Sequence, residues 1–208
     1  LLSMSRNLTP AVRWLLLANV GIFLLQALYP DAILERFALW PWQGAERDGL
    51  PPFEPWQLVS YAYLHGSLEH LFFNMFAVWM FGPEIERLLG TRRFNVYYLT
   101  CVASAALTQM LVQTVFGSEP SGPTVGASGA VFGLLLLFGM AFPRRRLMLI
   151  FPPIPMPAWL FVTLYGLTEL LMGVFGVLPG VAHFAHLGGM LGGFLLIRYW
   201  HATADRSR

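Results

Sequence analysis

The sequence predicts an all-α membrane protein, a bundle of six transmembrane helices that forms a single domain over residues 1–208. Three observations support this prediction: the composition, the spacing of the apolar segments and the placement of the arginines. Of the 208 residues, 56% are hydrophobic and 12% are charged, and the mean hydropathy is +0.59. Soluble globular domains carry about 25% charged residues. The composition therefore favours a polytopic membrane protein.

Six apolar segments approach the length that a membrane helix needs. They cover residues 14–29, 56–81, 94–116, 127–142, 156–177 and 181–200. A helix crosses about 30 Å of hydrocarbon with roughly 20 residues. Glycine and proline stand between the segments, for example at Gly82-Pro83 and at Pro152-Pro153, and these residues predict the helix ends. We therefore expect six helices, of which the first and fourth are the shortest.

The basic residues predict the orientation of the chain. All thirteen are arginines, and with six spans eleven of them fall on the side of both termini, leaving Arg36 and Arg47 on the other. This bias predicts cytoplasmic termini and an external segment 31–55. Because topology explains the basic clusters, the lipid bilayer is the expected partner and nucleic acid is not implied. The composition fits a bacterial inner membrane.

Polar residues inside the second segment are functional candidates, because polar groups are costly in hydrocarbon. His70 and Asn74 are four residues apart and share one face of a helix. Their donors would suit the stabilisation of an oxyanion. His65 lies five residues before His70 and points elsewhere on a continuous helix. We expect His65 to tie the external loop to the end of the helix.

The fourth segment opens on a serine between glycines, Gly126-Ala127-Ser128-Gly129. Glycines allow another backbone to approach closely, and a helix that starts here would present free backbone N–H groups beside Ser128. Such groups form half of an oxyanion hole without any side chain. Ser128 is therefore a candidate nucleophile.

In the sixth segment, His186, Gly189 and Gly193 share a face at spacings of three and four. Small residues on one face allow two helices to pack with their backbones nearly in contact. If the partner is the fourth segment, His186 can take the proton of Ser128, as in covalent acyl transfer. The acids within the apolar segments are Glu69 and Glu169, and the sequence gives no physical reason for Glu169. We therefore predict a dyad rather than a triad.

Three motifs on separate segments resemble the signatures of rhomboid intramembrane proteases: His65-x4-His70-x3-Asn74, Gly126-x-Ser128-Gly129 and Ala185-His186-x-x-Gly189. The resemblance implies a rhomboid-like six-helix bundle and a serine endopeptidase without metal or cofactor. Ser128 would be the nucleophile and His186 the general base. His70, Asn74 and the Ser128 backbone N–H would stabilise the oxyanion, and His65 would be structural. Transmembrane protein substrates would be cleaved near their extracytoplasmic end.

One position departs from the family pattern. Four residues after Ser128, where rhomboid proteases often have a tyrosine beneath the catalytic histidine, this chain has Phe132. We expect a ring stack on His186 without a hydroxyl contact. The resemblance also implies that residues 176–181 cap the site and that the fifth segment acts as a lateral gate.

Two other interpretations stay open. A catalytically inactive rhomboid-like scaffold would bind membrane clients without cutting them, although such relatives lack the serine or the histidine that this chain keeps. A haem- or metal-binding membrane protein would use the four imidazoles of two segments, His65, His70, His183 and His186, because bis-histidine ligation needs two facing rings. A zinc protease is disfavoured, because no His-Glu-x-x-His motif occurs.

Overall fold

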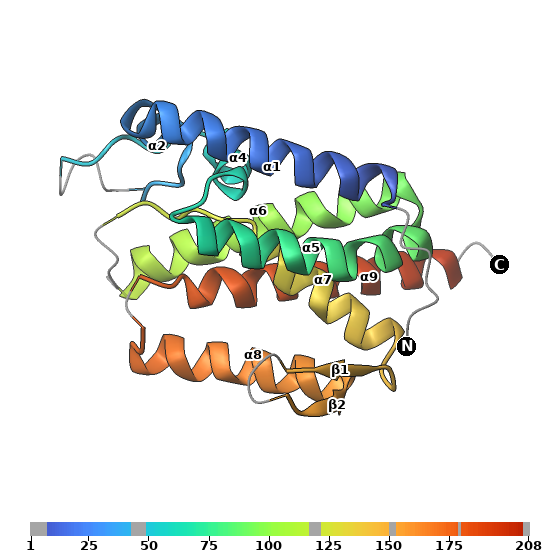
Figure 1. Ribbon diagram of the computed structural model, residues 1–208. Coiled ribbons are helices and arrows are strands. Elements are labelled where there is room, and N and C mark those ends of the chain that lie inside the picture. Colours follow the sequence, from blue (N-terminus) through green and yellow to red (C-terminus); the bar gives the residue numbers. More distant parts are fainter. Residues whose placement is uncertain (1–7, 43–48, 117–121, 150–152, 179, 206–208) are drawn as a thin grey trace.

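The computed structural model describes residues 8–42, 49–116, 122–149, 153–178 and 180–205. Within these ranges the chain is a bundle of helices, and its six long helices follow the order of the predicted segments (Figure 1). They are α1 (Pro10–Leu28), α5 (Leu68–Leu89), α6 (Thr91–Phe116), α7 (Ser128–Ala141), α8 (Ala158–Phe175) and α9 (His183–Asp205). The predicted all-α class is confirmed.

The surface of the bundle is apolar, as the membrane environment requires. Among the described residues, α1, α8 and the Thr91–Val115 part of α6 are long and apolar enough to cross a membrane, and α7 is a shorter apolar helix. Large apolar side chains on these helices are exposed, among them Trp14, Leu24, Leu111, Leu171 and Phe175. Exposed apolar surface of this extent marks contact with lipid. The protein is therefore an integral membrane protein.

The second helix begins later and ends later than the predicted segment 56–81. The start of that segment forms the short helix α4 (Gln57–Ser60) and a 3-10 turn (Tyr61–Tyr63). The long helix α5 then starts at Leu68, where the Ser67 hydroxyl accepts a hydrogen bond from the His70 backbone N–H at 3.2 Å. An N-cap of this kind satisfies a donor that the helix ladder leaves free. His65 therefore precedes the helix rather than lying on it.

The break predicted at Gly82-Pro83 is wrong, because Pro83 lies inside α5. A proline inside a helix removes one backbone donor, which disfavours the helix locally. Tertiary contacts with α1 stabilise it here: a Cβ on Gly82 would lie 2.7 Å from Val12, and the Glu86 carboxylate accepts the Ala11 and Val12 backbone N–H groups at 3.0 Å each. Packing against α1 thus overrides the local signal.

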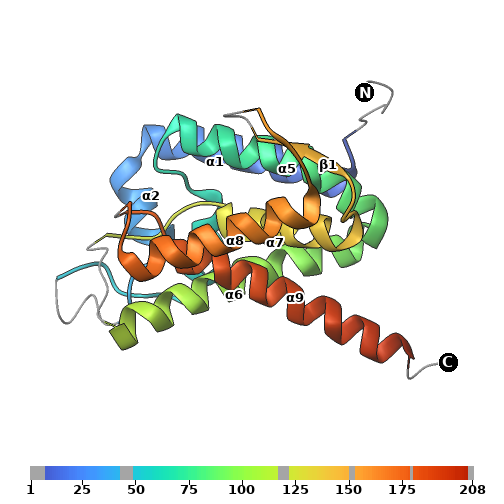
Figure 2. The ribbon, with the colours of Figure 1, turned by 90° about the horizontal axis from the view of Figure 1, so that it is seen from below.

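The sequence did not predict the small antiparallel sheet between α7 and α8. Strand β1 (Arg146–Met148) pairs with β2 (Pro155–Pro157), with Leu147 opposite Met156. An ion pair between Arg145 and Glu84, 3.2 Å long, connects the start of this hairpin to α5. The helix α8 follows β2 directly and runs across α7 and α9 (Figure 2).

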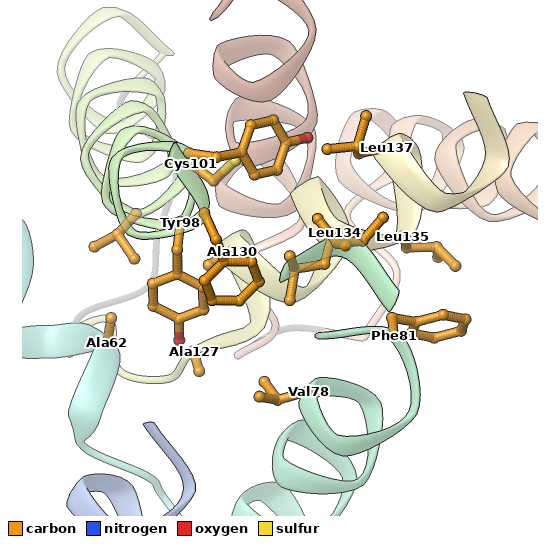
Figure 3. Packing of buried hydrophobic residues seen from close by; sticks show 14 of the residues in the cluster. Ala62, Val78, Phe81, Tyr98, Cys101, Ala127, Ala130, Leu134, Leu135 and Leu137 are labelled. Carbon is orange, nitrogen blue, oxygen red and sulfur yellow. The ribbon is translucent and has the colours of Figure 1, made fainter. Parts of the chain in front are cut away.

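The core lies where α6, α7 and α9 meet, and α9 packs most extensively against α6. The glycine face of α9 permits this approach: a Cβ on Gly192 would overlap the Ser104 side chain, and one on Gly189 would overlap the Gly129 carbonyl. The Ser104 hydroxyl also donates to the Gly188 carbonyl at 2.8 Å. Tyr98, Cys101, Ala130, Leu134 and Leu137 fill the space between the helices (Figure 3).

The fourth long helix begins inside the bundle rather than at its surface. Figure 1 shows α7 starting part-way down the bundle, away from the end where α6 stops. The segment that leads into it is fastened by a β-bridge between Leu39 and Thr124 and by a hydrogen bond from the Gly126 N–H to the Tyr61 carbonyl at 3.0 Å. These contacts place the first turn of α7 below the end of the bundle.

Candidate active site

Ser128 is the first residue of α7, and its side chain is half-buried. The first hydrogen bond into this helix runs from the Val131 N–H to the Ala127 carbonyl. The N–H groups of Ser128, Gly129 and Ala130 therefore precede the helical ladder and point toward the helix N-terminus. The partial positive charge of this terminus favours negative charge nearby.

His186 from α9 reaches Ser128 across the helix interface. Its Nε2 atom lies 2.8 Å from the Ser128 Oγ atom, which is hydrogen-bonding distance for a nucleophile and its base. The Phe132 ring lies parallel to the imidazole, with centroids 4.4 Å apart and an angle of 7° between the planes. The structure thus has the stack expected at Phe132.

His70 approaches the same place from α5, on the other side of Gly126. A Cβ on Gly126 would lie 2.7 Å from His70 Cε1 and 3.7 Å from Ser128 Oγ, and Gly126 has φ +123°. A residue with a side chain rarely adopts this φ. Glycine at 126 is therefore what allows the imidazole and the serine to lie so close together.

Asn74 is buried one helical turn after His70. Its Nδ2 group donates to the His70 carbonyl at 3.0 Å. An amide nitrogen carries two hydrogens, so one donor is left for a ligand. Asn74 and His70 both line the cavity that contains Ser128.

His65 is fully buried just before α5 and is held by its backbone. The Gln26 side chain of α1 accepts from the His65 N–H at 3.1 Å and donates to the His65 carbonyl at 2.9 Å. The imidazole lies edge-on to the His70 ring, with centroids 5.1 Å apart. The backbone of His65 thus ties this loop to α1, and its ring supports His70.

A cavity of about 990 Å³ opens beside Ser128 and His186, between α5 and α8. It is polar at the Ser128 end and apolar along most of its length. Its apolar walls come from α5, α7 and α8, and from the hairpin, and they include Phe73, Phe76, Met80, Val131, Leu135, Met148, Phe161 and Tyr165. Gly180 and Val181, from the segment expected to cap the site, also line it, whereas Pro179 lies outside the described residues. The lining suits an apolar segment next to the polar groups around Ser128.

The sequence prediction missed the role of Glu169 from α8, whose Oε2 atom contacts two histidines. It lies 2.8 Å from His186 Nδ1 and 2.7 Å from His183 Nδ1. All three side chains are buried. A signal existed, because a carboxylate within a membrane helix needs a partner and His183 and His186 are the nearest polar side chains on the next helix.

His70 and His186 are not arranged as two facing rings that could ligate a haem or a metal between them. His186 directs one ring nitrogen to Ser128 and the other to Glu169, so neither nitrogen faces His70. The ligating atoms of Glu169, His183 and His186 lie within 4.8 Å of one another and could reach a small cation. Two of the separations are ordinary hydrogen-bond distances, and these bonds account for the cluster by themselves.

Comparison with known proteins identifies the group to which this site belongs. The rhomboid domain family matches residues 52–203, which include the whole of α5 to α8 and most of α9. The chain belongs to the rhomboid family. The site described above therefore lies within a rhomboid domain.

Three curated relatives support the rhomboid assignment. Rhomboid protease GlpG of Yersinia pestis (strain Pestoides F) is 30% identical over 182 residues, 87% of this chain and 59% of the relative. Rhomboid protein 1, mitochondrial, of Saccharomyces cerevisiae is 29% identical over 154 residues, which are 73% of this chain and 43% of the relative. RHOMBOID-like protein 4 of Arabidopsis thaliana is 36% identical over 149 residues, which are 69% of this chain and 33% of the relative. In each case the match covers less than two thirds of the relative's own length.

The three rhomboid motifs lie on α5, α7 and α9 or just before them, and they converge on one cavity. His70, Asn74, Ser128 and His186 all line it. Gly129 also lines the cavity next to Ser128, and Gly129, Gly189 and Gly193 allow α7, α6 and α9 to pack closely. Glu169 lies on α8, outside all three rhomboid motifs, so motif reading alone could not assign it a role.

Proposed function

We propose that this rhomboid is an intramembrane serine endopeptidase, with Ser128 as the nucleophile and His186 as the general base. The observation that carries the proposal is the 2.8 Å contact between Ser128 Oγ and His186 Nε2 within a cavity of a membrane protein. A serine becomes a useful nucleophile when an adjacent base can take its proton. The relatives that are named proteases add support.

The reaction follows from this geometry. Ser128 Oγ attacks the carbonyl carbon of the scissile peptide bond as its proton passes to His186 Nε2. The carbonyl oxygen becomes an oxyanion, and the bond to the leaving nitrogen breaks when His186 returns the proton to that nitrogen. The acyl-enzyme is then hydrolysed by a water that gives its proton to His186, and Ser128 is regenerated.

The oxyanion is expected to form near the first turn of α7. The Ser128 backbone N–H lies at the start of this helix, before the hydrogen-bond ladder. His70 and the second amide hydrogen of Asn74 would donate from the other side of the cavity. Donors that are already in place where charge develops stabilise the transition state strongly.

The substrate class follows from the walls of the cavity. Apolar side chains of α5 and α8 line opposite sides, for example Phe76 and Phe161. A transmembrane segment of another protein would bury apolar residues between these helices while its unwound end reaches Ser128. We therefore propose transmembrane protein substrates that enter between α5 and α8.

The reaction would take place toward the extracytoplasmic side. Figure 1 shows the first residues of α1 and the last of α9 at the same end of the bundle. Seven arginines lie at or beside helix ends on that side: Arg13, Arg87, Arg92, Arg93, Arg144, Arg145 and Arg146. Four others lie outside the described residues: Arg6, Arg47, Arg206 and Arg208. The positive-inside rule makes this end cytoplasmic, with both termini there. A bacterial inner membrane fits this topology.

Labelling with a tagged fluorophosphonate probe, together with cleavage of a transmembrane substrate in liposomes, tests the proposal. Ser128→Ala and His186→Ala should each abolish cleavage without loss of folding. Ser104→Ala is the matched control, because its hydroxyl bonds to the Gly188 carbonyl away from the cavity. Cleavage that persists in both site variants would contradict the Ser128–His186 mechanism. A folded wild type that binds clients but is neither labelled nor active would instead be a scaffold.

A further inference from the structure

Four polar contacts form a continuous row from the nucleophile to the α8–α9 loop. Ser128 Oγ contacts His186 Nε2 at 2.8 Å, and His186 Nδ1 contacts Glu169 Oε2 at 2.8 Å. The same Glu169 oxygen contacts His183 Nδ1 at 2.7 Å, and His183 Nε2 contacts the Val177 carbonyl at 3.0 Å. We infer that Glu169 is the positioning residue for His186, so that the site works as a Ser128–His186–Glu169 triad; the inference rests on the proposed function.

Counting hydrogens along the row assigns the tautomer of His186. A carbonyl can only accept, so the His183 nitrogen that faces Val177 must carry a hydrogen. One proton then lies between His183 Nδ1 and Glu169 Oε2, whichever of the two atoms holds it. In either case Glu169 Oε2 keeps a lone pair for His186 Nδ1–H. The Nε2 atom of His186 is left without a hydrogen, as a base for Ser128 requires.

The ring stack alone would not produce this arrangement. Phe132 fixes the plane of the His186 imidazole, but a stacked ring can still rotate within its own plane or hold its hydrogen on the other nitrogen. The hydrogen bond to Glu169 selects one orientation and one tautomer. Glu169 thus supplies the function of the acidic member in serine hydrolase triads.

Glu169 also affects the charge that develops during the reaction. When His186 takes the proton of Ser128 it becomes an imidazolium, and the carboxyl group lies 2.8 Å from its Nδ1 atom. Glu169, His183 and His186 are all buried, so water screens this interaction little. The interaction is stronger with the imidazolium than with the neutral ring, so it lowers the barrier rather than only binding the ground state.

His183 holds the carboxyl group from its far side. It fills the second contact of Glu169 Oε2 and is itself anchored to the loop after α8 through Val177. A Cβ on Gly173 would lie 3.1 Å from the Phe184 ring and 3.2 Å from His183 Cβ, so glycine on α8 helps the start of α9 to pack closely against it. The carboxyl group is thereby fixed between two rings before substrate arrives.

Three variants of the full chain in liposomes test the inference. Glu169→Gln keeps the shape but removes the acidic group, and it should lower kcat by about a hundred-fold or more with KM within about two-fold of the wild type. Glu169→Asp restores the acidic group on a shorter stem and should recover about ten-fold of that loss. Glu86→Gln is the matched control, because it neutralises another buried carboxylate that bonds to α1; it should lower thermal stability and leave kcat unchanged.

The outcomes separate the inference from the proposed function. If the wild type cleaves and Ser128→Ala does not, but Glu169→Gln retains kcat within about three-fold, the positioning role is wrong and the dyad stands. If Glu169→Gln and Glu169→Asp lose kcat equally, shape rather than charge matters and the inference also fails. A loss of kcat after dialysis against EDTA would mean that Glu169, His183 and His186 hold a cation. An inactive wild type would overturn the proposed function and the inference with it.

Discussion

The Phe132 ring lies flat against the His186 imidazole, at a centroid separation of 4.4 Å and an interplanar angle of 7°. The Tyr165 ring of α8 lies behind Phe132, with the ring centroids 6.0 Å apart, and Phe161 stacks on Tyr165 with the centroids 4.8 Å apart. A row of rings therefore connects His186 to the wall of the cavity. The His186 imidazole is held on one face by this row and at its edge by Glu169.

The first prediction concerns this stack. Phe132→Leu should lower kcat about ten-fold, because an aromatic pair contributes about 0.5–1.5 kcal/mol beyond the area that it buries. Phe132→Tyr keeps the ring and should stay within about two-fold of the wild type. Steady-state cleavage in liposomes measures both values. Equal activity of the leucine variant and the wild type would mean that Glu169 orients His186 without help from the stack.

The second prediction concerns the oxyanion donors. His70→Ala and Asn74→Ala should each reduce kcat on the order of a hundred-fold, because each would remove a donor to the proposed oxyanion. Asn19→Ala is a matched control: Asn19 is buried in α1 and bonds to the carbonyl four residues earlier, as Asn74 does, but it lies away from the cavity. Unchanged rates in both site variants would refute the oxyanion role.

The third prediction concerns the packing of α9. Gly193→Val should destabilise the fold by about 1–3 kcal/mol, because a Cβ at this position would overlap the Tyr97 hydroxyl group and lie 3.0 Å from Cys101 Sγ. The Tyr97 hydroxyl donates to the Gly133 carbonyl, so the clash also disturbs α7. Thermal unfolding in detergent measures the loss.

Gly21→Ala provides the comparison for the packing prediction. Gly21 lies within α1, and no other part of the described structure comes within 4 Å of a Cβ placed there. Alanine favours a helix over glycine by about 1 kcal/mol. This variant should therefore melt at the same temperature as the wild type or above it. If Gly193→Val melted as high as Gly21→Ala, the close packing of α9 would be unimportant for stability.

Much of the fold could be predicted from local patterns. The apolar segments and arginine placement predicted an all-α membrane protein, and the rhomboid family followed from three motifs. The glycines of the sixth segment predicted a closely packed helix, and α9 packs closely on α6 and α7. These properties depend on composition and on short spacings within one segment, which the sequence displays directly.

The helix ends required the tertiary structure. Pro83 looked like a boundary but lies inside α5, because Val12 and the Glu86 carboxylate hold this part of α5 against α1. The helix start at Leu68 and the hairpin between α7 and α8 also differ from the predicted segments. The free energy of long-range packing can exceed the small free-energy differences behind local helix and strand propensities.

The sequence by itself determined the membrane class, the rhomboid family and four polar residues that line the cavity: His70, Asn74, Ser128 and His186. Only the tertiary structure decided what Glu169 contacts. Its need for a polar partner was visible in the sequence, but its spacing of seventeen residues from His186 does not fix a contact, because the two lie on different helices. Their 2.8 Å contact depends on how α8 crosses α9, and that crossing is set by side-chain packing along both helices.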